Sequence, residues 1–320
     1  MTSNNNRHAP AVVKSTTTVR TPTFLIIGVQ KAGTTSIYNY LKQHPQVYMS
    51  PVKETNFFER DWEQATVDTQ RRKKDGIITW QQYHRLFNGA TDQHLALGEV
   101  SPNYMLHYQF AAGQIYNRLP EIKLIAVLRN PVQRAFSDYL MHVRDAVGHQ
   151  TPLAEQVRSR GDSSHVLRKG KYYKSLKHFI DVFGRSRVDT FLYDDLKKNS
   201  QSFMREIYKS IGVSAEFVAN TTQKAQIAKV PKNQTINRIL KTQNPIRTVA
   251  TGIMQIFPTQ LRHHLRDQLI AMNSKAKNQA KFTEEDFILM RQYYREDILQ
   301  LQDLLQRDLS DWLDDVNPYA

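Results

Sequence analysis

Cysteine is absent from this 320-residue sequence, so neither a disulfide framework nor a thiolate metal site can form. A chain without disulfides is compatible with the reducing cytosol, and we expect a cytoplasmic protein. No apolar run approaches the roughly 20 residues that a membrane-spanning helix needs. The histidines show no spacing typical of metal ligands. We therefore expect no metal site.

Acidic residues and apolar runs are both missing from the first 20 positions, which are rich in Asn, Thr and Ser. A secretory signal needs an apolar core, so this stretch does not have the form of one. We predict a disordered leader over residues 1–20. Hydrophobic residues make up 40% of the chain, enough for a substantial core, and residues 21–320 are expected to form a single domain.

Acidic residues are also scarce relative to basic ones until the end of the chain. The net charge is +14, but residues 281–320 hold 4 basic and 10 acidic residues, whereas residues 1–280 hold 40 basic and 20 acidic ones. Such an excess indicates an anionic partner. Nucleic acid is one candidate. An anionic nucleotide together with a glycan or lipid surface explains the charge equally well.

The chain is organised around the stretch FLIIGVQKAGTTSIYN, residues 24–39. Its aliphatic start, Phe24 to Val29, is typical of a buried parallel strand. Gly28 and Gly33 bracket a turn that contains Lys31, and hydroxyl residues then open an amphipathic helix. A strand, a glycine turn and a helix start present free N–H groups and the positive helix end to an anion. A phosphate or sulfate group fits this turn.

The spacing differs from that of a nucleoside triphosphate P-loop. That motif places lysine directly after the second glycine, but here Thr34 follows Gly33 and the lysine lies inside the turn. The next aliphatic strand, Lys123 to Leu128, ends in Arg129 and supplies no acid for magnesium. The turn therefore favours a nucleotide held by protein cations. A phosphotransferase with an altered P-loop, which would require magnesium and ATP, and a simple capping turn are the alternatives.

Short aliphatic segments alternate with helical segments of ten or more residues, which predicts a parallel sheet covered on both faces. The helices include one from Pro131 to about Val147, one from Tyr172 to Phe183 and one from Asp195 to Ile211. The expected fold is α/β, with three layers and about five parallel strands. The predicted strands are Phe24–Val29, Gln46–Met49, Leu95–Val100, Lys123–Leu128 and Val188–Tyr193.

Two segments carry a family resemblance: QKAGTTSIYNYLKQHPQV, which starts at Gln30, and VLRNPVQRAFSDY, from Val127 to Tyr139. The first resembles the 5′-phosphosulfate loop of sulfotransferases that use 3′-phosphoadenosine 5′-phosphosulfate (PAPS), and the second their 3′-phosphate segment. The closest similarity is to the bacterial and heparan-sulfate-type branch, from about Thr23 to Leu313. It implies a P-loop-like fold and sulfonate transfer from PAPS to an acceptor hydroxyl, or less readily an amine, on a carbohydrate or glycolipid, leaving PAP.

The resemblance and the residues together suggest a nucleotide site. Lys31 can stabilise the bridging and departing oxygens, and Arg129, at the carboxyl end of a strand, is assigned with Ser137 to the 3′-phosphate. An arginine here could instead pair with Asp138 or Glu121. Tyr172 and Lys232 lie in segments that approach the nucleotide in the family, although a core tyrosine and a solvated lysine are the alternatives. The 5′-phosphate would contact Lys31, Ala32, Gly33, Thr34, Thr35 and Ser36.

Sulfonate transfer also needs a base, and two carboxylates are candidates. Glu54 lies in ETNFFE, which resembles the glutamate-plus-Phe-Phe motif of glycan sulfotransferases, and we favour it. Glu99 ends a strand in GEVSPNY and has the position of a buried structural acid. The cytosolic small-molecule branch uses a histidine after this strand, and none is present here. Glycan-specific relatives carry lysine at Val100 and histidine at Asn56, which argues against heparan-like acceptor recognition.

Three further segments complete the analysis. The run RRKK at residues 71–74 has the pattern of a solvated face or an acceptor-side basic patch. Residues 221–280 hold ten basic residues and one acid, so a basic lid, an acceptor-side helical layer and peripheral contact with a membrane are all open. Residues 281–315 are predicted to contain a C-terminal packing helix, capped by Thr283 with Asp286 three residues later. Non-enzymatic nucleic-acid binding is the remaining rival function.

Overall fold

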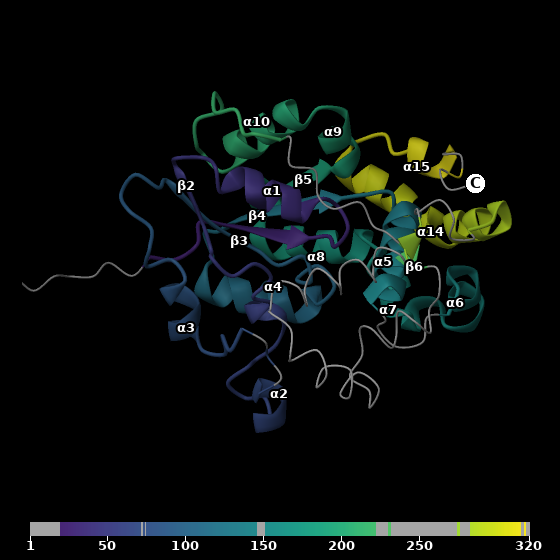
Figure 1. The fold of residues 1–320 in the computed structure, drawn as a ribbon, viewed down its shortest axis with the longest axis horizontal. Helices are drawn as coiled ribbons and strands as arrows, with labels where there is room; N and C mark the ends of the chain where they lie inside the picture. Colours follow the sequence, from purple (N-terminus) through teal and green to yellow (C-terminus); the bar gives the residue numbers. More distant parts are fainter. Residues whose placement is uncertain are drawn as a thin grey trace, which may run out of the picture.

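A computed structural model describes residues 20–71, 73, 75–145, 151–221, 230–231, 274–275, 282–314 and 317. Nearly all of the expected leader, residues 1–19, and most of the basic segment 221–280 lie outside these residues. Within the basic segment, β6 (Val230–Pro231) pairs antiparallel with β7 (Ser274–Lys275). The remaining described elements form one layered α/β unit (Figure 1).

The centre of the fold is a five-stranded sheet in which every neighbouring pair is parallel. Its strand order is β2-β3-β1-β4-β5. The five expected strands are confirmed, each to within one residue at either end. They are β1 (Phe24–Gly28), β2 (Val47–Met49), β3 (Ala96–Val100), β4 (Lys123–Leu128) and β5 (Val188–Leu192).

Helices cover both faces of this sheet, as the aliphatic strands require. One face carries α1 (Thr34–Leu41), α9 (Tyr193–Lys198) and α10 (Ser200–Ser210), and the other carries α4 (Tyr108–Arg118) and α8 (Tyr173–Phe183) (Figure 1). All five residues of β1 and of β3 are buried. The apolar character of these strands therefore reflects burial on two sides.

Most helices agree with the sequence pattern. The helix starting at Pro131 is α5 (Pro131–Asp145), and residues 146–150 beyond it are outside the described part. The C-terminal helix is α14 (Glu284–Leu305), and its start at Thr283 and Asp286 is a capping box, as expected. A shorter α15 (Asp311–Asp314) follows. No described helix is long and apolar enough to cross a membrane.

One prediction about helices was wrong in detail. The helix expected from Asp195 to Ile211 is divided into α9 and α10, because the Asn199 side chain accepts the Ser202 N–H and starts a new helix. The polar stretch 153–168 contains α6 (Leu153–Ser159) and α7 (His165–Arg168). Short helices α2 (Val67–Arg71) and α3 (Trp80–Arg85) precede β3 in the chain.

The order of the strands brings the turns after β1 and β4 together at one edge of the sheet. The chain leaves β1 toward β2 and leaves β4 toward β5, so the connections diverge between these adjacent strands. Ligands of open α/β sheets bind at such a point, outside the carboxyl ends of the strands. The Val29 N–H donates to the Val127 carbonyl at 2.8 Å, which holds the two strand ends together. The turns that carry Lys31 and Arg129 therefore begin side by side.

Candidate active site

The Lys31 turn has a backbone that opens toward the start of α1. Lys31 (φ 72°) and Gly33 (φ 81°) both have left-handed conformations, and Gly33 is the N-cap of the helix. A Cβ on Gly33 would lie 2.8 Å from the Leu196 side chain, so glycine is required by both space and backbone angle. The first N–H groups of α1 have no intrahelical partner. They and the helix dipole form a site for an anionic group.

The Lys31 ammonium has no ion-pair partner among the described residues. Its Nζ is 3.5 Å from the Met141 thioether on α5, and none of the described carboxylates forms an ion pair with it. Burial lowers the pKa of Lys31, with the Asp138 charge acting in the opposite direction. A half-buried cation against a thioether is costly to the fold and is therefore a strong candidate for contact with an anionic ligand.

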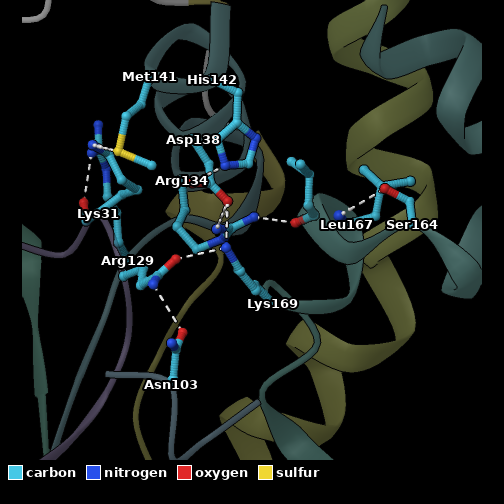
Figure 2. A network of polar contacts seen from close by, with 12 residues as sticks. Lys31, Asn103, Arg129, Arg134, Asp138, Met141, His142, Ser164, Leu167 and Lys169 are labelled. Atoms are coloured by element: carbon cyan, nitrogen blue, oxygen red, sulfur yellow. Dashed lines mark hydrogen bonds and ion pairs between the residues drawn. The ribbon is translucent and has the colours of Figure 1, made fainter. Parts of the chain in front are cut away.

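Arg129 joins Lys31 directly. Its Nη1 donates to the Lys31 carbonyl at 2.9 Å (Figure 2). Its guanidinium carbon lies 4.8 Å from the centre of the Tyr193 ring. The side chain is largely buried, and its Nε has no hydrogen-bond partner among the residues the structure describes. The two alternative partners are engaged elsewhere: Asp138 with Arg134 at 3.2 Å and Glu121 with Arg187.

Tyr172 is inside the protein rather than on the surface of the site. Only 1% of the residue is exposed, and its hydroxyl donates to the Arg129 carbonyl at 2.8 Å. Its own N–H donates at 2.7 Å to Asp297 on α14. Burial raises the pKa of Asp297 to about 6. Tyr172 thus supports the backbone of Arg129 from inside the protein.

The remaining predicted nucleotide contacts fall into three groups. Thr34 is buried, whereas Thr35 is exposed and Ser36 is half-buried at the start of α1. Ser137 is largely buried and lies one turn before Met141 on α5, so it shares the helix face that meets Lys31. Lys232 lies outside the described residues.

A buried charge cluster that the sequence did not suggest supports this site. The Asp138 carboxylate lies 3.2 Å from Arg134 Nη1 and 3.2 Å from Lys169 Nζ, with Arg134 and Asp138 fully buried (Figure 2). Lys169 also donates to the Gln30 side chain at 2.6 Å, and the Gln30 amide donates to Asn103 at 2.8 Å. The cluster thus fixes the residue next to Lys31.

The electrostatics of the cluster leave it positively charged. Burial alone would raise the pKa of Asp138, but Arg134 and then Lys169 hold it below its usual value. Burial lowers the pKa of Lys169, and the charges of Asp138 and Glu54 oppose this. One carboxylate therefore serves two cations. The sequence does not predict that Lys169 is part of this cluster, because the residue lies in the basic run RKGKYYK, which has the composition of a solvated face.

Glu54, the favoured base, lies in the loop after β2 and is held against the carboxyl end of β3. Its N–H donates to the Val100 carbonyl at 2.8 Å, and its backbone is left-handed at φ 62°. The carboxylate forms an ion pair with Lys53, and 40% of the side chain is exposed. An acceptor can therefore reach this carboxylate from solvent.

Glu99, the alternative base, has the opposite environment. It is completely buried, and burial raises its pKa although four hydroxyl groups act against this. These hydroxyls donate to the two carboxylate oxygens, from Thr55 at 2.9 Å, Tyr104 at 3.0 Å, Tyr83 at 3.2 Å and Ser101. With every donor coming from the protein, the carboxylate organises the loops after β2 and β3.

Lys73 corrects the interpretation of the run at residues 71–74. Its side chain is only 5% exposed, so a solvated face is wrong at this position. The ammonium donates to the Thr55 carbonyl, lies 3.3 Å from Asp75 and stands 4.2 Å from the centre of the Trp62 ring. Thr55, the residue after Glu54, is thus held by Lys73 through its carbonyl and by Glu99 through its hydroxyl.

Comparison with known proteins agrees with this geometry. Residues 22–216 match the model of the sulfotransferase family. The chain belongs to the sulfotransferase family. The sulfotransferase of Alicyclobacillus acidocaldarius has a similar solved structure, with a TM-score of 0.63 and 26% identity, covering 92% of this chain and 99% of that one. The recognition made from the two anion-binding segments and the P-loop-like fold are both confirmed.

Curated members of the sulfotransferase family are similar over part of their length. Heparan sulfate glucosamine 3-O-sulfotransferase 6 of Mus musculus is 34% identical over 183 residues, which cover 53% of this chain and 48% of that protein. Bifunctional heparan sulfate N-deacetylase/N-sulfotransferase 3 of Homo sapiens is 30% identical over 221 residues, covering 65% and 24% respectively. The chain therefore spans half or less of the length of these relatives.

Proposed function

We propose that this protein transfers the sulfonate group of PAPS to an acceptor hydroxyl, on a carbohydrate or glycolipid. The observation that carries the proposal is the pair Lys31 and Arg129. They contact each other at the carboxyl ends of β1 and β4, and neither is paired with a carboxylate among the described residues. Two cations held together without a counter-charge are stabilised by an anionic ligand.

A nucleotide with phosphate groups at both ends fits the residues present. The 5′-phosphosulfate would occupy the turn formed by Lys31, Gly33 and the first N–H groups of α1. The 3′-phosphate would contact Ser137 and Arg129, whose buried Nε has no partner in the described part of the chain. This division follows the family resemblance, and the unsatisfied guanidinium nitrogen supports it.

In the proposed reaction, an acceptor oxygen attacks sulfur while the bond between sulfur and the bridging phosphate oxygen breaks. The acceptor proton passes to the Glu54 carboxylate, and the electron pair of the broken bond remains on the departing PAP. Lys31 would stabilise the charge that develops on that oxygen. Its unpaired ammonium, held against a thioether, supplies this charge without first breaking an ion pair.

Exposure favours Glu54 over Glu99 as the base. A base must come within hydrogen-bond reach of the acceptor hydroxyl. The Glu54 side chain is 40% exposed, whereas Glu99 is completely enclosed and accepts four protein hydroxyls. We infer that Glu99 and Lys73 act on the reaction by positioning the segment that carries Glu54.

The test is a labelled-PAPS assay with Glu54→Gln and, as a matched control, Glu63→Gln, which changes an exposed glutamate in the same loop. We expect Glu54→Gln to abolish sulfonate transfer while PAP affinity, measured by calorimetry, stays within about twofold of wild type. Glu63→Gln should leave both unchanged. Full turnover in Glu54→Gln would refute the assignment of the base, and tighter binding of ATP with magnesium than of PAP would refute the reaction class.

A further inference from the structure

A cavity of about 340 Å³ opens beside the site, between the N-terminus of α8, the start of α4 and α14. It does not include Lys31 or Arg129, so the nucleotide assignment does not account for it. Its volume lies near the lower end of the roughly 300–1,000 Å³ of small-molecule sites. The lining residues are Met105, Leu106, Tyr108, Asp162, Arg168, Lys171, Lys174, Ser175, Glu296, Asp297 and Gln300.

The cavity leads toward the place of sulfonate transfer. A smaller pocket of about 20 Å³ shares Met105 and Arg168 with it and is also lined by Gln30, Asn103 and Lys169. Gln30 precedes Lys31 in the nucleotide turn, and its side chain accepts a hydrogen bond from Lys169 at 2.6 Å. The smaller pocket therefore connects the cavity with the residue next to Lys31.

The walls of the cavity differ in character. The side chains of Met105, Leu106 and Tyr108 form an apolar side, with the Tyr108 ring held edge-on by His178 at 5.3 Å. The other side carries equal numbers of cations and acids. These are Arg168, Lys171 and Lys174 against Asp162, Glu296 and Asp297.

Several of these charges are already satisfied by the protein. Lys171 donates to the Tyr293 carbonyl at 3.0 Å, Asp162 accepts the Tyr293 hydroxyl, and Asp297 accepts the Tyr172 N–H. Arg168, Lys174 and Glu296 are exposed at the mouth. The groups left for a ligand thus include hydrogen-bond donors and acceptors of both signs, opposite an apolar wall.

We propose that this cavity binds the acceptor, and that the acceptor is a small hydroxylated ligand of low net charge, such as a neutral or zwitterionic sugar. The proposal rests on the sulfotransferase function proposed above. A sugar ring presents an apolar face, which Tyr108 and Met105 can cover, and an edge of hydroxyls, which the polar wall can bind. A sulfated polymer carries many anionic groups, and a wall whose three cations are matched by three carboxylates offers it no net positive charge.

The direct test uses two probes, N-acetylglucosamine oligomers as neutral acceptors and heparan sulfate oligosaccharides as polyanionic ones. Gln300→Trp would fill the mouth of the cavity, since Gln300 lines it and is half-buried. Leu299→Trp is the matched control, because Leu299 is exposed on the same helix and does not line the cavity. A charge reversal, Lys174→Glu, is paired with Lys177→Glu one turn later on α8.

We expect transfer to the neutral oligomers, with Gln300→Trp raising the acceptor KM about tenfold or more while PAP affinity remains unchanged. Leu299→Trp and Lys177→Glu should match wild type, and Lys174→Glu should alter only the acceptor KM. Preferred transfer to heparan sulfate would overturn the proposed substrate class. Sulfotransferase activity with an unchanged acceptor KM in Gln300→Trp would overturn the cavity alone, and a protein without PAP affinity would overturn the nucleotide site instead.

Discussion

Asp138→Asn is the sharpest perturbation that the structure offers, because one carboxylate holds two buried cations. Asp138 contacts Arg134 and Lys169, each at 3.2 Å, and the side chains of Arg134 and Asp138 have no exposed surface. Asparagine preserves the size of the side chain and removes only its charge. The substitution therefore measures what the charge contributes.

The expected cost follows from burial. Removing one member of a buried ion pair typically costs about 3–5 kcal/mol, because the remaining charge stays desolvated without a counter-charge. Arg134 keeps the Val166 carbonyl and Lys169 keeps Gln30 as partners, so we expect the lower end, about 3 kcal/mol. The pair Lys177 and Asp181 has the same helical spacing but side chains 48% and 55% exposed. Asp181→Asn should therefore cost at most about 1 kcal/mol.

The assay is urea unfolding of wild type and both variants, followed by circular dichroism at neutral pH. Because the pKa of Asp138 is lowered in the fold, its contribution is present above the ordinary aspartate value of 3.8 and is lost as pH falls through the folded value. The difference in the free energy of unfolding between wild type and Asp138→Asn should thus persist from neutral pH down to 3.8 and shrink below that pH. Equal costs for the two asparagine variants would refute the reasoning. A poorly folding Asp138→Asn can be replaced by a triple variant with Arg134→Met, Asp138→Leu and Lys169→Met, which should be closer to wild type than Asp138→Asn.

Three further predictions follow from the same contacts. Lys31→Met should lower PAP affinity, measured by calorimetry, about 10–100-fold, because a charge-assisted contact is lost. In urea unfolding, the same variant should leave the free energy of unfolding unchanged or raise it by up to about 1 kcal/mol, because burial already opposes this charge. Asp297→Asn should gain stability relative to wild type as pH rises from about 4 to 6, because in wild type the folded pKa of Asp297 is raised to about 6, so that only the unfolded chain ionises readily over this range. The gain, measured in urea titrations at several pH values, is at most about 3 kcal/mol. A difference that does not change with pH would contradict this prediction. Gly33→Ala should cost more than about 1 kcal/mol of stability and weaken PAP binding, because its φ is 81° and the added carbon would meet Leu196; a stable variant with unchanged PAP affinity would show that the turn tolerates a side chain.

The sheet and the two anion-binding turns could be predicted because each is encoded locally. An aliphatic run ending at Gly28, a lysine in the turn and hydroxyls at a helix start are consecutive in the sequence, and their backbone geometry follows from residue type. The parallel arrangement then requires the ends of β1 and β4 to share one edge. The contact between Arg129 and the Lys31 carbonyl is the outcome of those two local facts.

The roles of the supporting residues could not be predicted, because these roles depend on contacts with residues far along the chain. Lys169 is 139 residues from Gln30 and 31 from Asp138, and nothing near it in the sequence distinguishes it from its solvated basic neighbours. The burial of Lys73 could not be predicted for the same reason, since it depends on Trp62 and the Thr55 carbonyl. Hydropathy patterns do not predict the burial of a lysine, whose stem is apolar and whose head needs a specific acceptor.

The described carboxylates are distributed so that the edge of the sheet with Lys31 and Arg129 keeps a positive charge. Asp138 is used by Arg134 and Lys169, while Glu121 lies before the start of β4, at the opposite end of that strand from Arg129, and pairs with Arg187. Asp297 is turned to the N-terminus of α8, where it fixes Tyr172 and through it the Arg129 carbonyl. Among the described residues, Lys31 and Arg129 thus retain charge that no carboxylate pairs with, which agrees with the proposed anionic ligand. If an added carboxylate near them, as in Met141→Glu beside Lys31, left PAP affinity unchanged, this uncompensated charge would not be what binds the nucleotide.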